Sequence, residues 1–483
     1  MKTLIPALIA LILMNSLLAF AQPGSLDSSF SKDGKMHSTA CRGILIQPDG
    51  KILVAGDGFN IIRLKTNGNV DKSFGINGIA STSFEGSNNG YLLAFQPDGK
   101  IVIAGYSVDN FDIFYVSLAR FTATGFLDSS FGINGQVKTD VNYYTPTGIA
   151  IASDGKILLT TSTGFDFLPN VLVLEYTANG SFHKEFGYDS GPYTRDISNA
   201  LVIQPGGKIV VAGSLYNNDS LGSTFALLRF KPNGSPDNGF GTSGKIILNY
   251  GEGVALALQS NDKIVAISGD SKLLRFKKNG SPDTSFGTGG KIEFPFQGRV
   301  VALQQDGKII VAGILDSNFA VARYKSNGKP DNTFGINGIA VTDLGKNDII
   351  FDAALQKDGK IVVSGISIAK SYFGRCVLVR YNGDATSLNT NSNEIPSNIA
   401  SQNFSGNVKT YPNPVKSVLN IDLKNTGSLK KTITIYDIKG KLLLTQSANG
   451  STQLDVRPLA AGTYLIRIGD GHGKFLYGKF IKE

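Results

Sequence analysis

A glycine turn followed by an apolar run recurs along this chain at intervals of about fifty residues. One copy reads QPDGKIVIAG from residue 96, and the others vary it slightly. The lysines that mark the seven copies are Lys51, Lys100, Lys156, Lys208, Lys263, Lys308 and Lys360. Repeats of this length that consist of apolar runs and glycine turns are typical of β-propeller blades. The repeat therefore predicts an all-β ring of seven similar units.

Each repeat contains four apolar runs, which we interpret as four strands. In the fourth repeat these are ALVI (200–203), KIVVAG (208–213), FALLRF (225–230) and KIILNY (245–250). Gly in the turn after the first run supplies the positive φ that a tight hairpin needs. The runs are continuously apolar because packed blades bury both faces of each strand. We therefore predict a seven-bladed β-propeller over residues 22–381.

The two ends of the repeat region complement each other. LDSSFSKDGKM (26–36) matches the back half of a repeat, such as LDSSFGINGQV (127–137). The seventh repeat reaches VLVRYNGD (377–384) and then lacks that half. We predict that a strand from the N-terminal segment completes the last blade and closes the ring.

Three further segments flank the repeats. Residues 1–21 combine Lys2, an apolar run and small residues at Ala19 and Ala21, which predicts a signal peptide cut after Ala21, with an uncleaved anchor as the alternative. No second stretch approaches the length of a membrane span, so we expect no integral membrane segment after cleavage. The Asn- and Ser-rich residues 382–407 predict a flexible linker. Alternating strands in residues 408–483 predict a separate β-sandwich of about seven strands.

Charge and cysteine content narrow the function classes. The net charge is +9, but residues 408–483 hold twelve Lys or Arg against five Asp or Glu, and the basic residues of the repeats are mixed with acids. This distribution does not favour nucleic-acid binding. His37, His183 and His472 lie far apart and form no zinc motif with the cysteines. Cys41 and Cys376 stand where the closing strand meets the last blade, so they form either a disulfide or two separate buried thiols.

An arginine and an aspartate recur at fixed positions in the repeats, eight residues apart. The pairs are Arg63 and Asp71, Arg120 and Asp128, Arg229 and Asp237, Arg275 and Asp283, and Arg323 and Asp331. Arg380 has no such partner in its own repeat, and we expect Asp27 to take that place. In the third repeat Glu175 and His183 reverse the charge order. We interpret these residues as structural ion pairs, for which losing one partner costs about 3 kcal/mol; the alternative is a ring of arginines that binds anions.

A phenylalanine and a glycine follow each aspartate in the D-x-x-F-G element. The phenylalanines are Phe74, Phe131, Phe240, Phe286 and Phe334. We expect these rings to fill the core and the glycine to let the chain turn.

Two resemblances follow from these motifs. The elements YPNPV (411–415), TIYDIKGK (434–441), LAAGTYLIRI (459–468) and GKFIKE (478–483) resemble the type A C-terminal sorting domain of the type IX secretion system of Bacteroidetes-type bacteria. The repeats resemble delta-60 β-propeller repeats, a family with no generally assigned chemistry. The first resemblance implies recognition of residues 408–483 by the secretion machinery, and a secreted or outer-surface location. The second implies only the fold.

The variable loops are the expected place for a ligand, because tight turns occupy the opposite face of the disc. These loops carry Asp109, Asp112, Asp166, Tyr216 and Asp219, which could form a calcium or sugar site, although no calcium-binding loop motif is present and no cofactor is expected. Arg42 and Arg299 are expected near the mouth of the central channel. Solvated polar loops without a ligand are the alternative.

Three function classes fit this sequence. We favour a non-catalytic binding or adhesion module for an extracellular glycan, protein or envelope component. A polysaccharide hydrolase or lyase would need a carboxylate pair drawn from residues such as Asp109, Asp112 and Asp166, and the absence of Trp disfavours it. A purely structural surface protein is the third class.

Overall fold

A computed structural model describes residues 22–140, 144–163, 171–188, 196–215, 224–345, 347–368, 374–384, 409–411, 414–422, 431–437, 442–448, 451–469 and 475–483. The expected signal peptide and nearly all of the expected linker lie outside these residues. The chain divides into two compact units, Met1–Thr386 and Ser387–Glu483. Every regular element in the described part of the chain is a strand, and no helix there has the length and apolarity to cross a bilayer.

The first unit contains seven four-stranded antiparallel sheets, here called blades 1 to 7. Blades 1 to 3 consist of β2 (Ala40–Ile46), β3 (Ile52–Gly56), β4 (Phe59–Leu64), β5 (Ile79–Thr82); β6 (Ser87–Phe95), β7 (Ile101–Val108), β8 (Phe114–Phe121), β9 (Gln136–Asp140); β10 (Tyr144–Ile151), β11 (Ile157–Thr163), β12 (Val171–Tyr176), β13 (Phe182–Tyr188). Blades 4 and 5 consist of β14 (Ile197–Ile203), β15 (Ile209–Leu215), β16 (Thr224–Phe230), β17 (Lys245–Leu248); β18 (Gly253–Leu258), β19 (Ile264–Ser268), β20 (Lys272–Phe276), β21 (Lys291–Glu293). Blades 6 and 7 consist of β22 (Gln297–Leu303), β23 (Ile309–Leu315), β24 (Asn318–Tyr324), β25 (Ile339–Thr342); β26 (Asn347–Leu355), β27 (Ile361–Ile368), β28 (Gly374–Tyr381), β1 (Lys35–Ser38).

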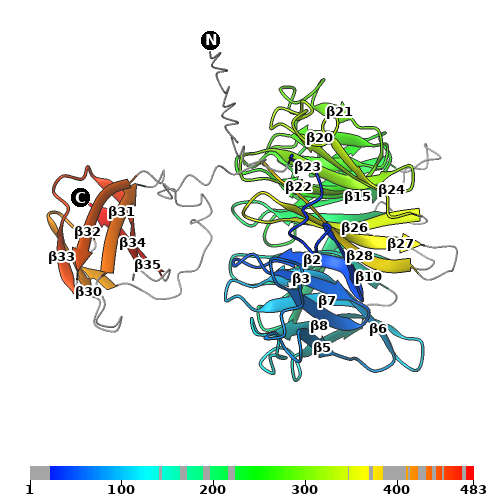
Figure 1. Cartoon of the computed structure of the whole chain (residues 1–483), viewed down its shortest axis with the longest axis horizontal. Coiled ribbons are helices and arrows are strands. Elements are labelled where there is room, and N and C mark those ends of the chain that lie inside the picture. Colours follow the sequence, from blue (N-terminus) through cyan, green and yellow to red (C-terminus); the bar gives the residue numbers. More distant parts are fainter. Residues whose placement is uncertain are drawn as a thin grey trace, which may run out of the picture. The chain divides into compact units, whose positions relative to one another are not determined.

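The blades form a closed ring. The first strand of each blade contacts the first strand of the next, and β26 of blade 7 contacts β2 of blade 1. Figure 1 shows these first and last blades side by side. The N-terminal strand β1 pairs with β28, with Met36 opposite Leu378. The predicted seven-bladed propeller and its closure by an N-terminal strand are thus confirmed.

The recurrent turn between the first two strands of a blade is held by its own side chains. In blade 1 the amide of Gly50 donates to the carbonyl of Gln47, and Gly50 has a φ of 84°. Asp49 Oδ1 accepts a hydrogen bond of 3.2 Å from the amide of Lys51. Asp and Gly therefore recur because one satisfies the turn and the other tolerates its left-handed backbone.

The D-x-x-F-G element and the Asn-Gly-type turn of the next blade fit together. Phe74 is fully buried, and a Cβ added to Gly125 of blade 2 would lie 2.8 Å from its ring. The same contact joins Phe286 to Gly328. Glycine is thus required in the turn because the phenylalanine of the preceding blade packs against it, which confirms that these rings fill the core.

The N-terminal segment supplies the backbone hydrogen bonds of the turn that the last repeat lacks. The amide of Gly335 donates to the carbonyl of Pro23 at 2.8 Å, as Gly287 donates to Asn327 at the preceding junction. Gly24, with a φ of 85°, donates to the carbonyl of Asn382. The turn is therefore assembled from two distant parts of the chain.

The second unit is a sandwich of two sheets, as predicted. Its strands are β29 (Lys409–Tyr411), β30 (Val418–Asp422), β31 (Lys431–Asp437), β32 (Leu442–Ala448), β33 (Thr452–Asp455), β34 (Gly462–Gly469) and β35 (Phe475–Lys482). The sheet orders are β29-β30-β33 and β32-β31-β34-β35. Leu419, Ile433, Leu454, Ile466 and Phe480 are buried together between them.

Candidate functional site

The innermost strand of every blade has a β-bulge or register shift, and a side chain from each irregularity lines one central cavity of about 700 Å³. An extra residue in one strand bends the backbone and redirects its side chain. The seven side chains, from blade 1 to blade 7, are those of Arg42, Tyr91, Thr147, Asn199, Val254, Arg299 and Phe351. These residues are called the bulge ring below. They are the strongest candidate site because all seven side chains line the same cavity, which is called the channel below.

Several members of the bulge ring also connect neighbouring blades. The Tyr91 hydroxyl donates to the carbonyl of Pro146 at 2.7 Å, and burial raises the pKa of this phenol, which keeps it protonated. Asn199 Nδ2 donates to the carbonyl of Gly253 at 2.9 Å. These bonds hold the two side chains in fixed positions at the channel wall.

The two arginines of the bulge ring are exposed within the channel lining. The guanidinium carbon of Arg42 lies 4.8 Å from the ring centroid of Phe351, a cation-π distance. Within the described ranges neither Arg42 nor Arg299 has a carboxylate at ion-pair distance. The structure therefore places both residues in the wall of the same cavity.

Asp352 is the one carboxylate in the described lining of this cavity. Its Oδ2 accepts a 2.8 Å hydrogen bond from the amide of Ile44 in blade 1, and its Oδ1 accepts one of 2.8 Å from the amide of Ala353. Burial raises the pKa of this carboxyl to about 6, against the opposing effect of the two amides. Asp352 therefore joins blade 7 to blade 1 and carries a full negative charge only above that pH.

The recurrent arginines and aspartates lie away from the channel, in buried ion pairs. Arg Nε to Asp Oδ2 distances are 2.7 to 3.0 Å in the six arginine pairs, including Arg380 with Asp27. The marker lysine of the D-G-K turn shares the same aspartate in several blades, for example Lys263 with Asp283 at 2.8 Å. Of the other two nitrogens of Arg63, Nη1 reaches the next blade and donates to the carbonyl of Ala123 at 3.2 Å, and Nη2 donates to the Ser73 hydroxyl at 3.1 Å. The guanidinium groups are thus bound by other groups of the protein. These arginines do not form an open ring that could bind anions.

In blade 3 the expected pair of Glu175 with His183 lies at the limit of ion-pair distance, and two lysines lie closer to the same carboxylate. His183 Nε2 lies 4.0 Å from Glu175 Oε1 and its side chain is 54% exposed. Lys156 and Lys184 each lie 3.5 Å from the carboxylate, and Lys184 Nζ also donates to the carbonyl of Asn233 in blade 4 at 3.0 Å. Lys184 rather than His183 therefore replaces arginine, because only the longer side chain reaches both the buried acid and the next blade.

Asp384 makes a connection that sequence reasoning missed. At the junction of blades 6 and 7, its Oδ1 lies 2.7 Å from Nη2 of Arg323. The corresponding arginines of blades 1, 2, 4, 5 and 7 donate to a backbone carbonyl of the next blade. The sequence signal for this contact was the aspartate directly after Asn-Gly in the last repeat. Its partner could not be predicted from the sequence, because the turn beside it is assembled from two distant parts of the chain.

The loop residues do not form a shared site within the described part of the chain. Asp109 organises its own loop: its Oδ1 accepts the amides of Phe111 and Ile113, and its Oδ2 accepts the hydroxyl of Tyr115 at 3.0 Å. Desolvation opposes ionisation, but these hydrogen bonds lower the pKa of Asp109. Asp112 has a φ of 62° in the same turn. Asp166, Tyr216 and Asp219 lie outside the described residues, and no group of three or more His, Cys, Asp or Glu within those residues is placed to hold a metal.

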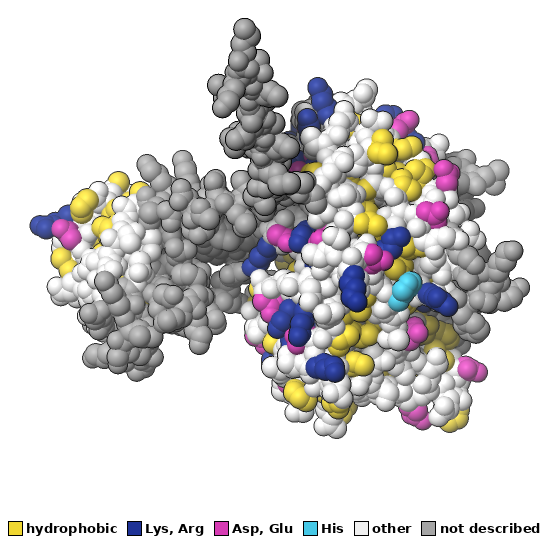
Figure 2. Space-filling view, in the orientation of Figure 1, with side chains coloured by type: hydrophobic (Ala, Val, Ile, Leu, Met, Phe, Trp, Pro, Cys, Tyr) yellow, Lys and Arg dark blue, Asp and Glu magenta, His cyan; other side chains and the backbone are white. Residues whose placement is uncertain are grey.

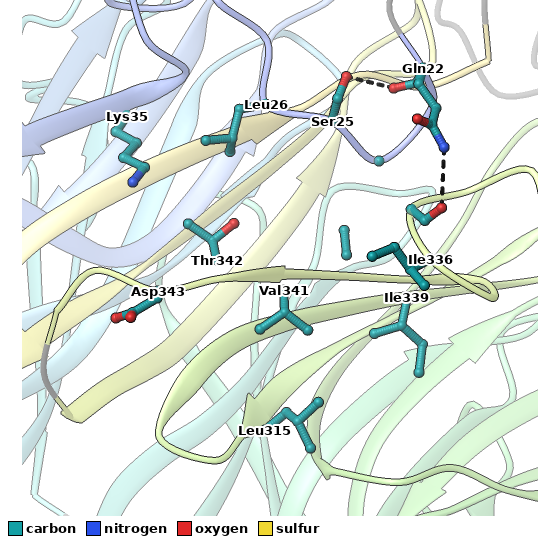
Figure 3. A pocket seen from close by; sticks show the side chains of 13 residues that line it. Gln22, Ser25, Leu26, Lys35, Leu315, Ile336, Ile339, Val341, Thr342 and Asp343 are labelled. Carbon is teal, nitrogen blue, oxygen red and sulfur yellow. Dashed lines mark hydrogen bonds between the residues drawn. The ribbon is translucent and has the colours of Figure 1, made fainter.

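A second cavity, of about 690 Å³, lies where the N-terminal segment crosses the outer strand β25 of blade 6. Figure 3 shows Gln22 and Ser25 on one side and Ile336, Ile339 and Val341 on the other. Gln22 Nε2 donates to the carbonyl of Gly335 at 3.2 Å. The contacts that line this groove include those that close the ring, so it is a by-product of closure and a weaker candidate site.

The two cysteines form a disulfide. Cys41 in β2 is bonded to Cys376 in β28, across 335 residues of sequence. The bond joins the first strand of blade 1 to the third strand of blade 7, beside the pairing of β1 with β28. Of the two readings of these cysteines, the structure therefore has the disulfide.

On the face of the propeller in Figure 2, basic and acidic side chains are interspersed. This face therefore has no patch of a single charge sign.

Comparisons with known proteins agree with this architecture. Residues 409–483 match the secretion system C-terminal sorting domain, and residues 47–74, 96–131, 204–240, 259–286 and 304–334 match the DUF5122 β-propeller, a domain of unknown function. No curated protein matches the chain.

Solved structures resemble the chain only distantly. They include PorZ, a surface component of the type IX secretion system of Porphyromonas gingivalis (13% identity, TM-score 0.40, 96% of this chain and 60% of that one). The polysaccharide lyase Uly1 (12%, 0.46, 72% and 91%) and the WD40 propeller domain of Doa1 (12%, 0.45, 75% and 97%) are also similar. This chain thus spans 60% of the length of PorZ. The sheet order identifies the protein as a seven-bladed β-propeller; five of its segments match the DUF5122 domain, and its C-terminal unit matches a type IX secretion sorting domain, which directs it to the cell surface or the medium.

Proposed function

We propose that the exported propeller is a non-catalytic binding module that takes part of an extracellular glycan into its central channel. The observation that carries this proposal is the bulge ring. Where the fold needs a residue, the repeats keep it, as with the core phenylalanines. At the bulge the repeats instead place Arg, Tyr, Thr, Asn, Val, Arg and Phe. Such variety on a repeated scaffold favours recognition of an asymmetric ligand.

The dimensions and chemistry of the channel support the same proposal. A volume of about 700 Å³ lies within the range of small-ligand sites, about 300 to 1,000 Å³. Tyr91, Tyr106 and Phe351 supply aromatic surface, and Thr145 and Asn199 supply hydroxyl and amide groups. These groups suit the apolar faces and hydroxyls of a sugar.

A plugged channel tests the proposal. In the mature full chain, Val254→Trp would place an indole inside the cavity and obstruct it, whereas Ile247→Trp adds an indole to β17 on the rim, where Ile247 is exposed and lines neither cavity. We expect a glycan array to bind the parent chain and the rim variant and to lose the plugged variant. Equal binding by both variants would remove the channel from the proposal. Shortening of the bound glycan by the parent chain would show catalysis instead.

A further inference from the structure

We propose that the glycan bound in the channel is acidic, and that Arg42 and Arg299 receive its carboxylate or sulfate groups. This inference rests on the proposed function and adds the charge of the ligand. It starts from a contrast between two sets of arginines. Arg63, Arg275 and Arg323, for example, are buried in ion pairs that hold the blades together. Arg42 and Arg299 are exposed in the channel wall and take no part in such pairs.

The arrangement of blades concentrates these two charges. Arg42 belongs to blade 1 and Arg299 to blade 6, and blade 7 stands between them with Phe351 in the bulge ring. Like charges that line one channel repel each other, and they focus a positive potential into that channel. A negatively charged ligand relieves this repulsion. Ligand binding therefore accounts for two arginines whose ion pairing the fold does not supply.

Phe351 also prepares Arg42 for such a ligand. Its ring centroid lies 4.8 Å from the guanidinium carbon, and the N–H groups of Arg42 make no hydrogen bond to the described residues. Guanidinium edges bind carboxylate and sulfate oxygens through paired, charge-assisted hydrogen bonds. The cation-π contact therefore holds Arg42 at the channel wall without using the donors that recognition needs.

The one acidic group in the described lining does not cancel these charges. Both oxygens of Asp352 accept backbone amides, and burial raises the pKa of its carboxyl to about 6. Arg42, Tyr91 and Arg299 are the other titratable or charged side chains that line the cavity beside it, together with Tyr106. The channel is thus net positive in its described lining.

Calorimetric titration of the mature full chain tests the inference. The probes are oligogalacturonate, its methyl ester as the uncharged match, and a sulfated oligosaccharide of similar length. We expect the acidic probes to bind and the ester to bind at least tenfold more weakly; the stronger of the two acidic probes identifies the preferred anion. Because each lost charge-assisted contact weakens binding about tenfold, Arg42→Gln with Arg299→Gln should weaken acidic binding about a hundredfold. Arg375→Gln, an exposed arginine on β28 outside the cavity, is the matched control and should change nothing.

The outcomes separate the charge of the ligand from the glycan-binding function itself. If the ester binds as tightly as the acid and Val254→Trp abolishes both, the glycan-binding function stands and the acidic preference is wrong. If the double arginine variant keeps full acidic affinity at an unchanged unfolding midpoint, the arginines are not the receptors. If no saccharide of either charge binds, the inference and the proposed function fail together.

Discussion

Lys184 does in blade 3 what arginine does in the other blades, although it stands in a different position of the repeat. Glu175 is buried, with 3% of its surface exposed, and depends on Lys156 and Lys184 for compensation. We expect Lys184→Met to lower the free energy of unfolding by about 1 to 3 kcal/mol, because it leaves the buried acid half compensated and the carbonyl of Asn233 without its donor. Guanidinium unfolding measures this. His183→Ala is the neighbouring control. An equal loss of unfolding free energy in that variant would mean that His183 compensates Glu175 as much as Lys184 does.

Asp352 and the paired aspartates have opposite effects on stability as pH changes. The pKa of Asp71 is lowered to about 2, since hydrogen bonds from Ser73 and Lys51 and the charge of Arg63 outweigh desolvation. A lowered pKa contributes stability above the ordinary value of 3.8, which is lost as pH falls towards 2. The pKa of Asp352 is raised to about 6, so its contribution is full below 3.8 and is lost as pH rises through 6.

The Asp352→Asn variant isolates this second effect. Its neutral side chain does not titrate, so its stability relative to the parent should rise between pH 4 and pH 7, by at most about 3 kcal/mol for a shift of about two pKa units. Urea unfolding at several pH values between these limits measures the difference. A difference that stays constant with pH would mean that Asp352 titrates normally in the folded chain.

At the scale of strands, the disulfide and the pairing of β1 with β28 secure the same seam. Because the bond between Cys41 and Cys376 encloses most of the propeller, its removal should restore much chain entropy to the unfolded state, about 3 to 5 kcal/mol. We expect Cys41→Ser with Cys376→Ser to lower the midpoint of guanidinium unfolding accordingly. Reductant should lower the midpoint of the parent and leave the double variant unchanged. If reductant changed neither, the seam would be held by its hydrogen bonds alone.

Strand number, blade number and closure could be predicted because each depends on a pattern repeated within the chain. The D-G-K turn marks every blade, and the half repeat at 26–36 has a visible counterpart. The partner of Arg380 followed from the same spacing. Pairings that break the pattern could not be predicted in this way: Lys184 lies one position beyond His183, and its reach to blade 4 depends on the angle between adjacent sheets.

The bulge ring was also hidden from sequence reasoning, apart from the expectation that Arg42 and Arg299 stand near the channel. A bulge adds one residue to a strand without changing the apolar pattern on either side of it. No single amino-acid type is common to the seven positions, so no motif marks them. Comparing the repeats at the fifth residue before Gln96 or Gln304 would have aligned Tyr91 with Arg299, and only the register shows why that position matters.

At the scale of the whole molecule, export and the proposed binding function belong to two different units of the chain. Residues 409–483 match the sorting domain, and they form a compact core of their own. We expect a chain that ends at residue 407 to remain inside the cell envelope, whereas the full chain reaches the surface or the medium. Cell fractionation with a periplasmic marker measures this, and the truncated chain should keep the unfolding midpoint of the propeller. Normal appearance of the truncated chain in the medium would contradict the assignment.

Ring closure is the property on which the channel, the seam and the blade order all depend. Asp27 meets Arg380 at 2.7 Å, and the pKa of its carboxyl is lowered, against desolvation, by a hydrogen bond from Ser29 and by the charge of Arg380. We expect a mature chain without residues 22–38 to unfold at a markedly lower temperature, because β28 then loses its edge partner and Arg380 its acid. A synthetic peptide of residues 22–38 should restore the midpoint when added in excess, and the same peptide with Asp27→Asn should restore less of it. If the shortened chain melts at the temperature of the full chain, the ring does not need its N-terminal strand.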